Sequence, residues 1–236
     1  MSINNSYFLV TGSSSGLGES ICKTLDKQGL KFLGIDINEG NYTNLKIDLS
    51  KITKKDIDQI KNITNDIGIH SIIHCAAQQK FPGNNLKDIE EVFNEVFSVN
   101  VKSIYILIKM LEDNFLNNSS VCIVSSVHSK ATTENNTLYA SSKSAITGLV
   151  KGLTIEQKSK MSIFEVVLGA MDSPMLLNSI SKKEISNLEK KLPSEKILEV
   201  DEVGNLILDL LNNHRHILHG SSISIDNGVL SQLSTN

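Results

Sequence analysis

Short apolar runs alternate with longer amphipathic stretches along this chain. Several runs are nearly continuous in Ile, Val and Leu, which is typical of strands that are covered on both faces by helices. The pattern predicts strands at residues 7–11, 31–36, 44–48, 71–75, 120–125, 163–168 and 221–226. Helical periodicity predicts helices at residues 16–28, 54–66, 88–116, 137–158 and 201–211. This alternation indicates an α/β fold with a doubly wound, seven-stranded parallel sheet flanked by helices.

No repeat, low-complexity tract or linker divides the sequence, so we expect a single domain over residues 1–236. The formal net charge is -3 and no basic cluster is present, which gives no electrostatic case for nucleic acid or an anionic membrane as partner. The first residues lack the regions of a signal peptide, and no apolar run reaches the roughly 18 residues of a membrane span. We therefore expect a cytoplasmic protein.

The three cysteines form no CxxC pair, and each sits in an apolar run. Such cysteines usually behave as small buried apolar residues, which favours a reducing compartment and argues against a disulfide or zinc framework. No group of His, Cys, Asp and Glu has metal-ligand spacing, so we expect no metal site. His214, His216 and His219 precede the last predicted strand, and we interpret them as part of a solvated turn.

A loop of sequence TGSSSGLG, at residues 11–18, joins the first predicted strand to the first predicted helix. Glycines allow a sharp turn and close approach of a ligand, and a helix N-terminus offers free N–H groups. These features suit a pyrophosphate, although the spacing is GxxxGxG rather than GxGxxG. The same residues occur in ordinary turns, so it is the position between strand and helix that makes the signal strong.

Asp36 ends the second predicted strand, about twenty residues beyond the glycine loop, where an acidic residue would bond the adenosine ribose hydroxyls. A carboxylate there repels the additional phosphate of NADP, and neither Ser15 nor Ile37 supplies a cation to receive it. We therefore favour NAD; the alternative is that Asp36 only begins a polar turn. Asp48 and Leu49 close the third predicted strand, where Asp48 could contact adenine or simply cap the next segment.

Tyr139 and Lys143 lie four residues apart in a predicted helix and so share one face. Our hypothesis is that Tyr139 transfers a proton, Lys143 lowers its pKa and Ser126 holds the substrate oxygen. The alternative is a surface tyrosine and lysine on an amphipathic helix. Asn100 lies inside the long predicted helix 88–116, where asparagine is locally unfavourable and needs partners. Its sequence position suits a structural role as well as a catalytic one.

Together these residues resemble the short-chain dehydrogenase/reductase family in its compact single-domain branch. The resemblance covers residues 7–228 and rests on TGSSSGLG, Asp36, Asp48-Leu49, Asn100, Ser126 and the YASSK motif at 139–143. It implies a Rossmann-type fold, a homodimer or homotetramer, and an NAD-dependent oxidoreductase that interconverts a secondary alcohol and its carbonyl. Ser126 is chosen over Ser125 because the interval from Ser126 to Tyr139 is the one such enzymes commonly show.

The resemblance also implies the roles of individual residues. Tyr139 would be the general acid in reduction and the general base in oxidation, while Lys143 would bind the nicotinamide ribose and lower the pKa of Tyr139. Ser126 would hydrogen-bond the substrate oxygen, and Asn100 would position a water that links Lys143 to solvent. The residues implied to contact the cofactor are Gly12, Ser14, Ser15, Gly16, Leu17, Asp36, Ile37, Asp48, Leu49, Ala76, Tyr139, Lys143, Met171 and Ser173.

Two segments depart from the family pattern. His74-Cys75-Ala76-Ala77 stands in place of Asn-Asn-Ala-Gly after the fourth predicted strand. We interpret His74 as structural, with a contact on the adenosine side as the alternative. Leu168-Gly169 replaces Pro-Gly after the sixth, which would loosen a cofactor loop. Residues 173–200 occupy the place of the family's substrate lid, with an amphipathic surface helix as an equal alternative.

The sequence does not identify the substrate. An NADPH-dependent 3-oxoacyl reductase would share the fold and the catalytic residues, although Asp36 argues against it. A reductase of a sugar-derived substrate is a further alternative. A nucleotide-sensing regulatory protein is the alternative from another class, and the intact set of Asn100, Ser126, Tyr139 and Lys143 argues against it.

Overall fold

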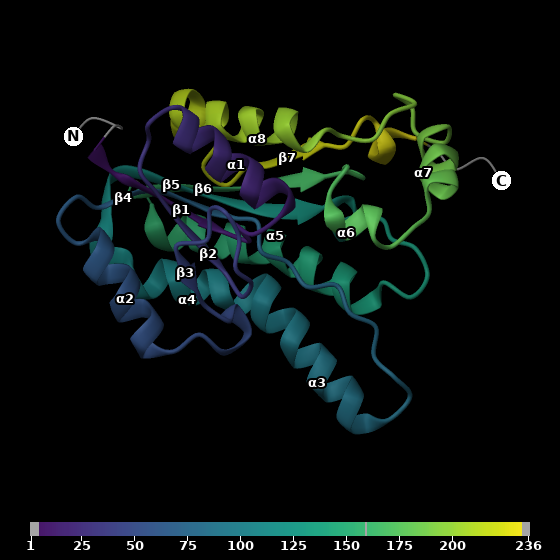
Figure 1. Cartoon of the computed structure of the whole chain (residues 1–236), viewed down its shortest axis with the longest axis horizontal. Helices are drawn as coiled ribbons and strands as arrows, with labels where there is room; N and C mark the ends of the chain where they lie inside the picture. The colour runs from purple at the N-terminus through teal and green to yellow at the C-terminus, as the bar shows by residue number, and fades with distance from the viewer. Residues whose placement is uncertain (1–4, 159, 233–236) are drawn as a thin grey trace.

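The computed structural model describes residues 5–158 and 160–232. Its parallel strands pair in the order β3-β2-β1-β4-β5-β6-β7 (Figure 1), which confirms the predicted doubly wound sheet. The strands are β1 (Tyr7–Thr11), β2 (Phe32–Asp36), β3 (Leu45–Lys46), β4 (Ile69–His74), β5 (Phe115–Ser126), β6 (Met161–Leu168) and β7 (Ser222–Ile225). Each lies within a few residues of a predicted strand.

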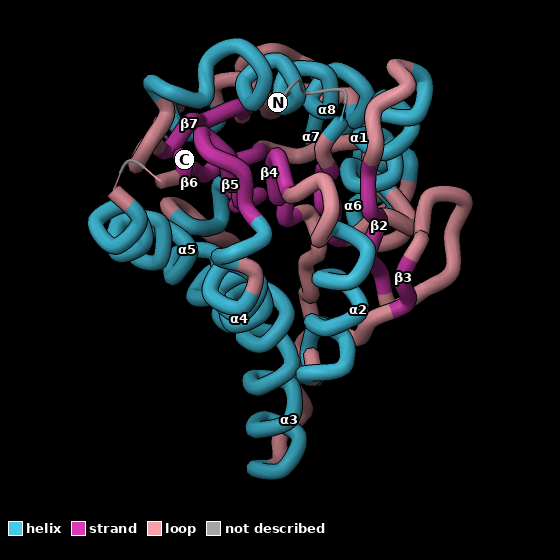
Figure 2. Tube along the Cα trace, turned by 90° about the vertical axis from the view of Figure 1, so that its left-hand side faces the viewer, coloured by secondary structure: helices cyan, strands magenta, loops and turns pink. Residues whose placement is uncertain are grey.

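Helices cover both faces of the sheet (Figures 1 and 2). α1 (Gly16–Lys27) and α8 (Val200–Asp209) lie on one face, and α2 (Lys54–Thr64), α4 (Ser103–Met110) and α5 (Thr137–Gln157) lie on the other. α3 (Leu86–Phe97) projects from the body, while α6 (Pro174–Leu177) and α7 (Lys182–Glu189) stand beyond the carboxyl ends of the strands. The three layers leave this end of the sheet accessible to a ligand.

The two faces of the sheet carry separate apolar clusters. In β1, Leu9 joins the cluster that packs against α2, α4 and α5, whereas Phe8 and Val10 join the cluster that packs against α1 and α8. Consecutive side chains of a strand point to opposite faces, so both faces need apolar residues here. Burial of one large aliphatic side chain contributes about 1.5–3 kcal/mol. The continuous apolar runs of the sequence follow from this arrangement.

The helix predicted at residues 88–116 is wrong in its continuity and its end. A π-helical turn, Ser98–Lys102, joins α3 to α4, and β5 already begins at Phe115. The side-chain amide of Asn114 donates to Thr64 Oγ1 (3.3 Å) and to Asn65 Oδ1 (3.2 Å), which holds the chain against the end of α2. Apolar spacing alone does not separate the end of a helix from a strand that follows closely.

The interpretation of His219 as part of a solvated turn is also wrong. Its Nδ1 accepts a hydrogen bond from the backbone N–H of Ile163 (3.1 Å), and its Nε2 donates to the carbonyl oxygen of Thr154 (3.1 Å). The ring therefore ties β6 to α5 just before β7. His214 and His216 are exposed, as expected.

Replacement of His219 by alanine should lower the free energy of unfolding by about 2 kcal/mol, because two partly buried backbone groups lose their partners. Urea denaturation would measure the loss. His216→Ala is the matched control, and a change of less than about 0.5 kcal/mol is expected for this exposed histidine. Equal losses in the two variants would show that the ring of His219 is not a tie between elements.

Candidate active site

A cavity of about 690 Å³ opens at the carboxyl ends of the strands. It spans the point between β1 and β4 where the order of the strands reverses, which is the usual ligand site of a doubly wound sheet. Every residue that was expected to contact the cofactor lines this cavity, and so does Ser126. The structure thus brings these positions together, while their role in binding stays a prediction.

The glycine loop has the geometry of an anion-binding turn. Gly12 has a φ of +75°, and a Cβ there would lie 2.8 Å from the backbone nitrogen of Ala76. A Cβ at Gly18 would lie 2.1 Å from the carbonyl oxygen of Gly12, so only glycine allows this turn. Ser15 is the N-cap of α1 but makes no side-chain cap bond, which leaves the first N–H groups of the helix for a ligand. The loop fits a pyrophosphate.

Two carboxylates, Asp36 and Asp48, also line the cavity, and Asp36 contacts the glycine loop directly. Asp36 Oδ2 accepts a hydrogen bond from the N–H of Ser14 (3.0 Å), and Oδ1 accepts one from the N–H of Asn38 (2.9 Å). Both oxygens keep lone pairs for further donors. Asp48 Oδ1 accepts from the N–H and the hydroxyl of Ser50 (2.9 and 2.7 Å), so Asp48 caps the next segment. Among the described residues that line the cavity, Lys143 is the one lysine or arginine.

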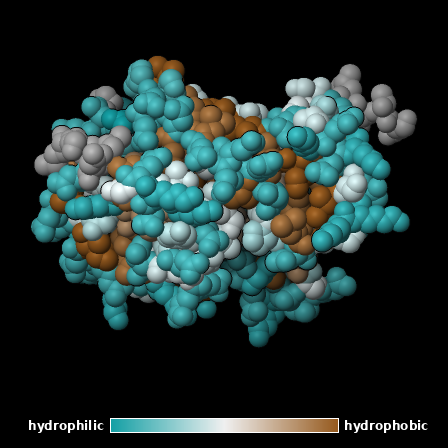
Figure 3. Space-filling view, turned by 45° about the horizontal axis from the view of Figure 1, so that its top comes forward, coloured by the Kyte–Doolittle hydropathy of each residue, from teal (hydrophilic) through white to brown (hydrophobic). Residues whose placement is uncertain are grey.

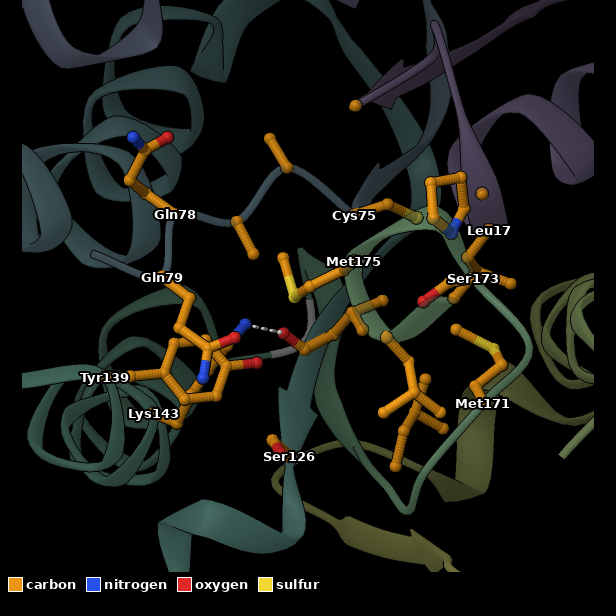
Figure 4. Close-up of a pocket in the computed structure, with 18 of the residues that line it drawn as sticks. Leu17, Cys75, Gln78, Gln79, Ser126, Tyr139, Lys143, Met171, Ser173 and Met175 are labelled. Carbon is orange, nitrogen blue, oxygen red and sulfur yellow. Dashed lines mark hydrogen bonds between the residues drawn. The ribbon is translucent and has the colours of Figure 1, made fainter. Parts of the chain in front are cut away.

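Ser126, Tyr139 and Lys143 converge on the cavity from β5 and α5 (Figure 4). Tyr139 is 8% exposed and Lys143 is 2% exposed, so the alternative of a surface pair is wrong. The Nζ atom of Lys143 donates to the carbonyl oxygen of Val124 (2.8 Å) and lies 5.6 Å from the centroid of the Tyr139 ring. Ser125 instead donates to the carbonyl oxygen of Lys143 (3.3 Å).

Burial governs the protonation of the tyrosine and the lysine. Desolvation raises the pKa of Tyr139 to about 12, and a hydrogen bond with Ser126 opposes this rise. Desolvation also lowers the pKa of Lys143 to about 8, opposed by Cys75 and Glu165. Burial thus dominates the pKa of Tyr139 in the protein alone, and the expected lowering of this pKa by Lys143 stays a prediction.

Glu165 is a buried carboxylate that the sequence pattern did not single out. It is 0% exposed in β6, and its Oε1 accepts a hydrogen bond from the hydroxyl of Thr147 (2.8 Å), one helical turn beyond Lys143. Its Oε2 is buried and has no hydrogen-bond partner within the described chain. Its charge raises the pKa of Lys143. In the sequence, Glu165 is a single acidic residue within the apolar predicted strand 163–168, and this feature could have indicated it.

Asn100 lies in the π-helical turn and is fully buried, but its side chain does not line the cavity. Its Oδ1 accepts from the N–H of Gln78 (2.7 Å), and its Nδ2 donates to the carbonyl oxygen of Gln78 (3.0 Å) and to Ser142 Oγ (2.9 Å). These bonds brace the segment after β4 against α5. The expected role in positioning a water stays a prediction.

His74 confirms its interpretation as a structural residue. Its Nε2 donates to the carbonyl oxygen of Val99 (3.3 Å), so its Nδ1 accepts from the hydroxyl of Thr11 (2.8 Å). Burial, followed by the charge of Lys143, lowers the pKa of His74 to about 3, and the ring is neutral at physiological pH. His74 therefore ties β1 to the turn that carries Asn100.

The cavity lining includes two polar residues, Gln79 and His128, that the sequence pattern did not indicate. The side chain of Gln79 reaches toward the Tyr139 ring (Figure 4), and its Nε2 donates to Asn136 Oδ1 (2.6 Å). The ring of His128 stands edge-on to Tyr139 with centroids 5.7 Å apart. Gln79 follows the end of β4 and His128 follows the end of β5. A position just beyond a strand end was the sequence feature that could have indicated both residues as lining the site.

The segment expected to form a lid contributes an apolar wall. Met175 and Leu176 line the cavity from α6, and Leu188 lines it from α7. The backbone N–H of Val200 donates to Asp172 Oδ1 (2.7 Å), which ties the end of the segment to its beginning. The expectation that residues 173–200 act as a lid that opens and closes stays a prediction.

Within the described ranges, the helices are all too short or too polar to cross a membrane. No group of three or more His, Cys, Asp or Glu residues in those ranges is arranged to hold a metal ion.

Replacement of Lys143 by methionine should make stability less dependent on pH. The pKa of Lys143 is about 8 in the folded protein against 10.5 for an ordinary lysine, so between these values the unfolded state binds more protons and stability rises with pH. The variant lacks this rise and should be more stable than wild type at pH 7 by up to about 3 kcal/mol.

Urea denaturation at pH 7 and pH 10 would measure the difference between the two proteins, which should shrink at the higher pH. Lys151→Met, at an exposed position of α5, is the control and should show no such change. A stability difference for Lys143→Met that is the same at both pH values would contradict the lowered pKa of Lys143.

The comparisons with known proteins agree with this geometry. The family model for short chain dehydrogenase matches residues 6–184. L-xylulose reductase of Caenorhabditis elegans is 24% identical, over 93% of this chain and 94% of that protein. The 3-oxoacyl-[acyl-carrier-protein] reductase of Thermotoga maritima is also 24% identical, over 98% of this chain and the whole of that protein.

Among solved structures, a short chain dehydrogenase family protein from Francisella tularensis has a TM-score of 0.85 and 25% identity, covering 96% of this chain and 99% of that one. The resemblance noted in the sequence is confirmed by the family model, which spans most of the chain. This chain belongs to the short-chain dehydrogenase family and is an NAD(P)-dependent oxidoreductase of alcohol and carbonyl groups.

Proposed function

We propose that the protein uses NAD to interconvert a small secondary alcohol and its carbonyl, with Tyr139 as proton donor and acceptor. The observation that carries this proposal is the convergence of Ser126, Tyr139 and Lys143 on one cavity with the glycine loop. Three side chains of this chemistry, from two elements, meet where a dinucleotide would end.

The chain offers a contact for each part of the cofactor. The free N–H groups at the start of α1 would bind the pyrophosphate, and Asp36 would accept hydrogen bonds from the adenosine ribose. An ammonium has three donors, so Lys143 keeps two for the nicotinamide ribose after its bond to Val124. When bound, the nicotinamide supplies or accepts the hydride.

Proton transfer would take place at the phenolic oxygen of Tyr139. In reduction, Tyr139 donates a proton to the carbonyl oxygen while the hydroxyl of Ser126 hydrogen-bonds the same atom as its charge grows. In oxidation, Tyr139 must first lose its proton, and a pKa of about 12 leaves little phenolate near neutral pH. Positive charge at Lys143 and in the oxidised cofactor would lower that pKa, and alkaline conditions would favour oxidation.

Replacement of Tyr139 by phenylalanine should reduce turnover by at least about 1000-fold, because the proton donor is lost. NADH fluorescence should show a dissociation constant within a few-fold of wild type. Tyr105→Phe, which removes the hydroxyl of a tyrosine that is 41% exposed, should leave turnover unchanged. A parallel loss of NADH binding and turnover would instead mean that Tyr139 supports the shape of the cavity.

The preference for NAD over NADP is supported by Asp36 and by the absence of a lysine or arginine from the adenosine end of the described cavity lining. An NADPH-dependent 3-oxoacyl reductase is the second candidate, favoured by the similarity to the Thermotoga maritima protein. The similarity to L-xylulose reductase supports a sugar-derived substrate instead. A nucleotide-sensing protein without catalysis has no such support.

Replacement of Asp36 by asparagine should reduce the preference for NADH over NADPH by about tenfold or more. The change removes the repulsion of the 2′-phosphate and keeps the shape of the side chain. Dissociation constants of both cofactors, measured by fluorescence in wild type and variant, give the ratio. A wild-type protein that binds NADPH more tightly would rule out the role assigned to Asp36.

A homodimer or homotetramer is also part of the proposal. Ile89 and Phe93 of the projecting helix α3 are 42% and 44% exposed, and a Cβ at Gly148 or Gly152 of α5 would meet no atom within 4 Å. Apolar patches likewise interrupt the polar surface on the face shown in Figure 3. We further propose a single domain whose residues 173–200 cover the substrate, and, from the free cysteines, a cytoplasmic location.

A further inference from the structure

We propose that Gln79 and His128 form an uncharged hydrogen-bonding subsite that selects a second oxygen on the carbon next to the reacting carbon. The substrate class is then a vicinal hydroxy ketone or the matching diol. This inference rests on the proposed function, because it takes the reacting carbonyl to lie between Ser126 and Tyr139.

Gln79 brings an amide into the cavity that Tyr139 also lines. The residue lies on the segment after β4, and its side chain reaches toward the Tyr139 ring (Figure 4). The amide nitrogen donates to Asn136 Oδ1 (2.6 Å), and Asn136 donates in turn to Thr133 Oγ1 (2.9 Å). These bonds orient the amide, so that its oxygen and its second N–H are available to a ligand in the cavity.

His128 supplies the second polar group of this subsite. Its backbone N–H donates to Ser126 Oγ (3.3 Å), and its ring packs edge-on against Tyr139. Its Nδ1 hydrogen-bonds Thr132 Oγ1 (2.8 Å), while its Nε2 makes no hydrogen bond within the described residues. Partial burial lowers the pKa of His128, so the ring is neutral at physiological pH and binds without charge.

The charges around the cavity argue against an anionic substrate. Lys143 is the one cation among the described lining residues, and its proposed partners are the cofactor ribose and Tyr139. Glu95 also lines the cavity and accepts hydrogen bonds from Lys80 Nζ (2.6 Å) and Gln78 Nε2 (3.0 Å). A carboxylate or phosphate would meet acidic and neutral groups here, with no free cation to balance it.

Discrimination follows from the cost of leaving polar groups unpaired. An alkyl ketone would cover Gln79 and His128 without replacing their bonds to water, which costs about 1–3 kcal/mol for each group. A hydroxyl next to the carbonyl can both donate and accept, so it satisfies either residue. Met175 and Leu176 close the apolar side of the same space and favour a short carbon chain.

The test compares two ketones of equal size, 3-hydroxybutan-2-one and 3-methylbutan-2-one, with NADH as reductant. Wild type should favour the hydroxy ketone by at least about tenfold in kcat/KM. Gln79→Leu and His128→Phe should each lower this ratio by about tenfold, mainly through loss of kcat/KM for the hydroxy ketone. Met175→Leu, a matched change on the apolar wall, should keep the ratio.

The ratio of the two kcat/KM values within one protein does not depend on the fraction of that protein that is folded. Gln79→Met and His128→Leu are second variants that should lower the ratio in the same way, which shows that the effect does not come from one particular replacement side chain. The inference is overturned if wild type prefers 3-methylbutan-2-one or pyruvate to 3-hydroxybutan-2-one, or if the variants lose activity on both ketones equally. It is also overturned if the protein binds NADH but reduces neither ketone. Failure to bind NADH or NADPH at all would instead overturn the proposed function.

Discussion

The desolvation of Lys143 is the constraint on which the site depends. An ammonium in a fully buried place is stable only with an acceptor, and the carbonyl oxygen of Val124 provides one at 2.8 Å. The pairing of β5 with β4 stops at Ile123, one residue before Val124, whereas β5 itself runs on to Ser126. The packing of α5 on the sheet therefore sets the position of the charge and, through it, the environment of Tyr139. The buried carboxylate of Glu165 adds a second support from β6.

Buried polar contacts hold the rim of the cavity in place. His74 joins Thr11 of β1 to Val99, and Asn100 joins the backbone of Gln78 to Ser142 of α5. These contacts pass through the π-helical turn, which brings the asparagine side chain to the segment after β4. A neutral histidine can donate to one oxygen and accept from another. His74 therefore connects these segments although the sequence lacks the Asn-Asn-Ala-Gly motif after β4.

The sequence predicts the sheet and the glycine loop well because both depend on local patterns: apolar runs for strands, and glycines between a strand and a helix. Contacts between residues that are distant in the sequence cannot be predicted from such local patterns. Asn114 contacts Thr64 of α2 just before β5 begins, and His219 bonds the backbone of β6 and of α5. The place of Gln79 in the cavity was not predicted for the same reason, since it lies sixty residues before Tyr139 in the chain.

The central place of β1 has a consequence for how the chain folds during synthesis. Val10 pairs with Gly34 of β2 on one side and with Ile73 of β4 on the other. Both edges of β1 are therefore hydrogen-bonded only after β2 and β4 have been synthesised. Loop closure over such distances is slow, and an unpaired edge can join another chain. A nascent chain that does not yet include β4 therefore exposes an apolar strand with one unpaired edge, which can pair with other chains. Molecular chaperones that shield such strands would act most usefully in that interval.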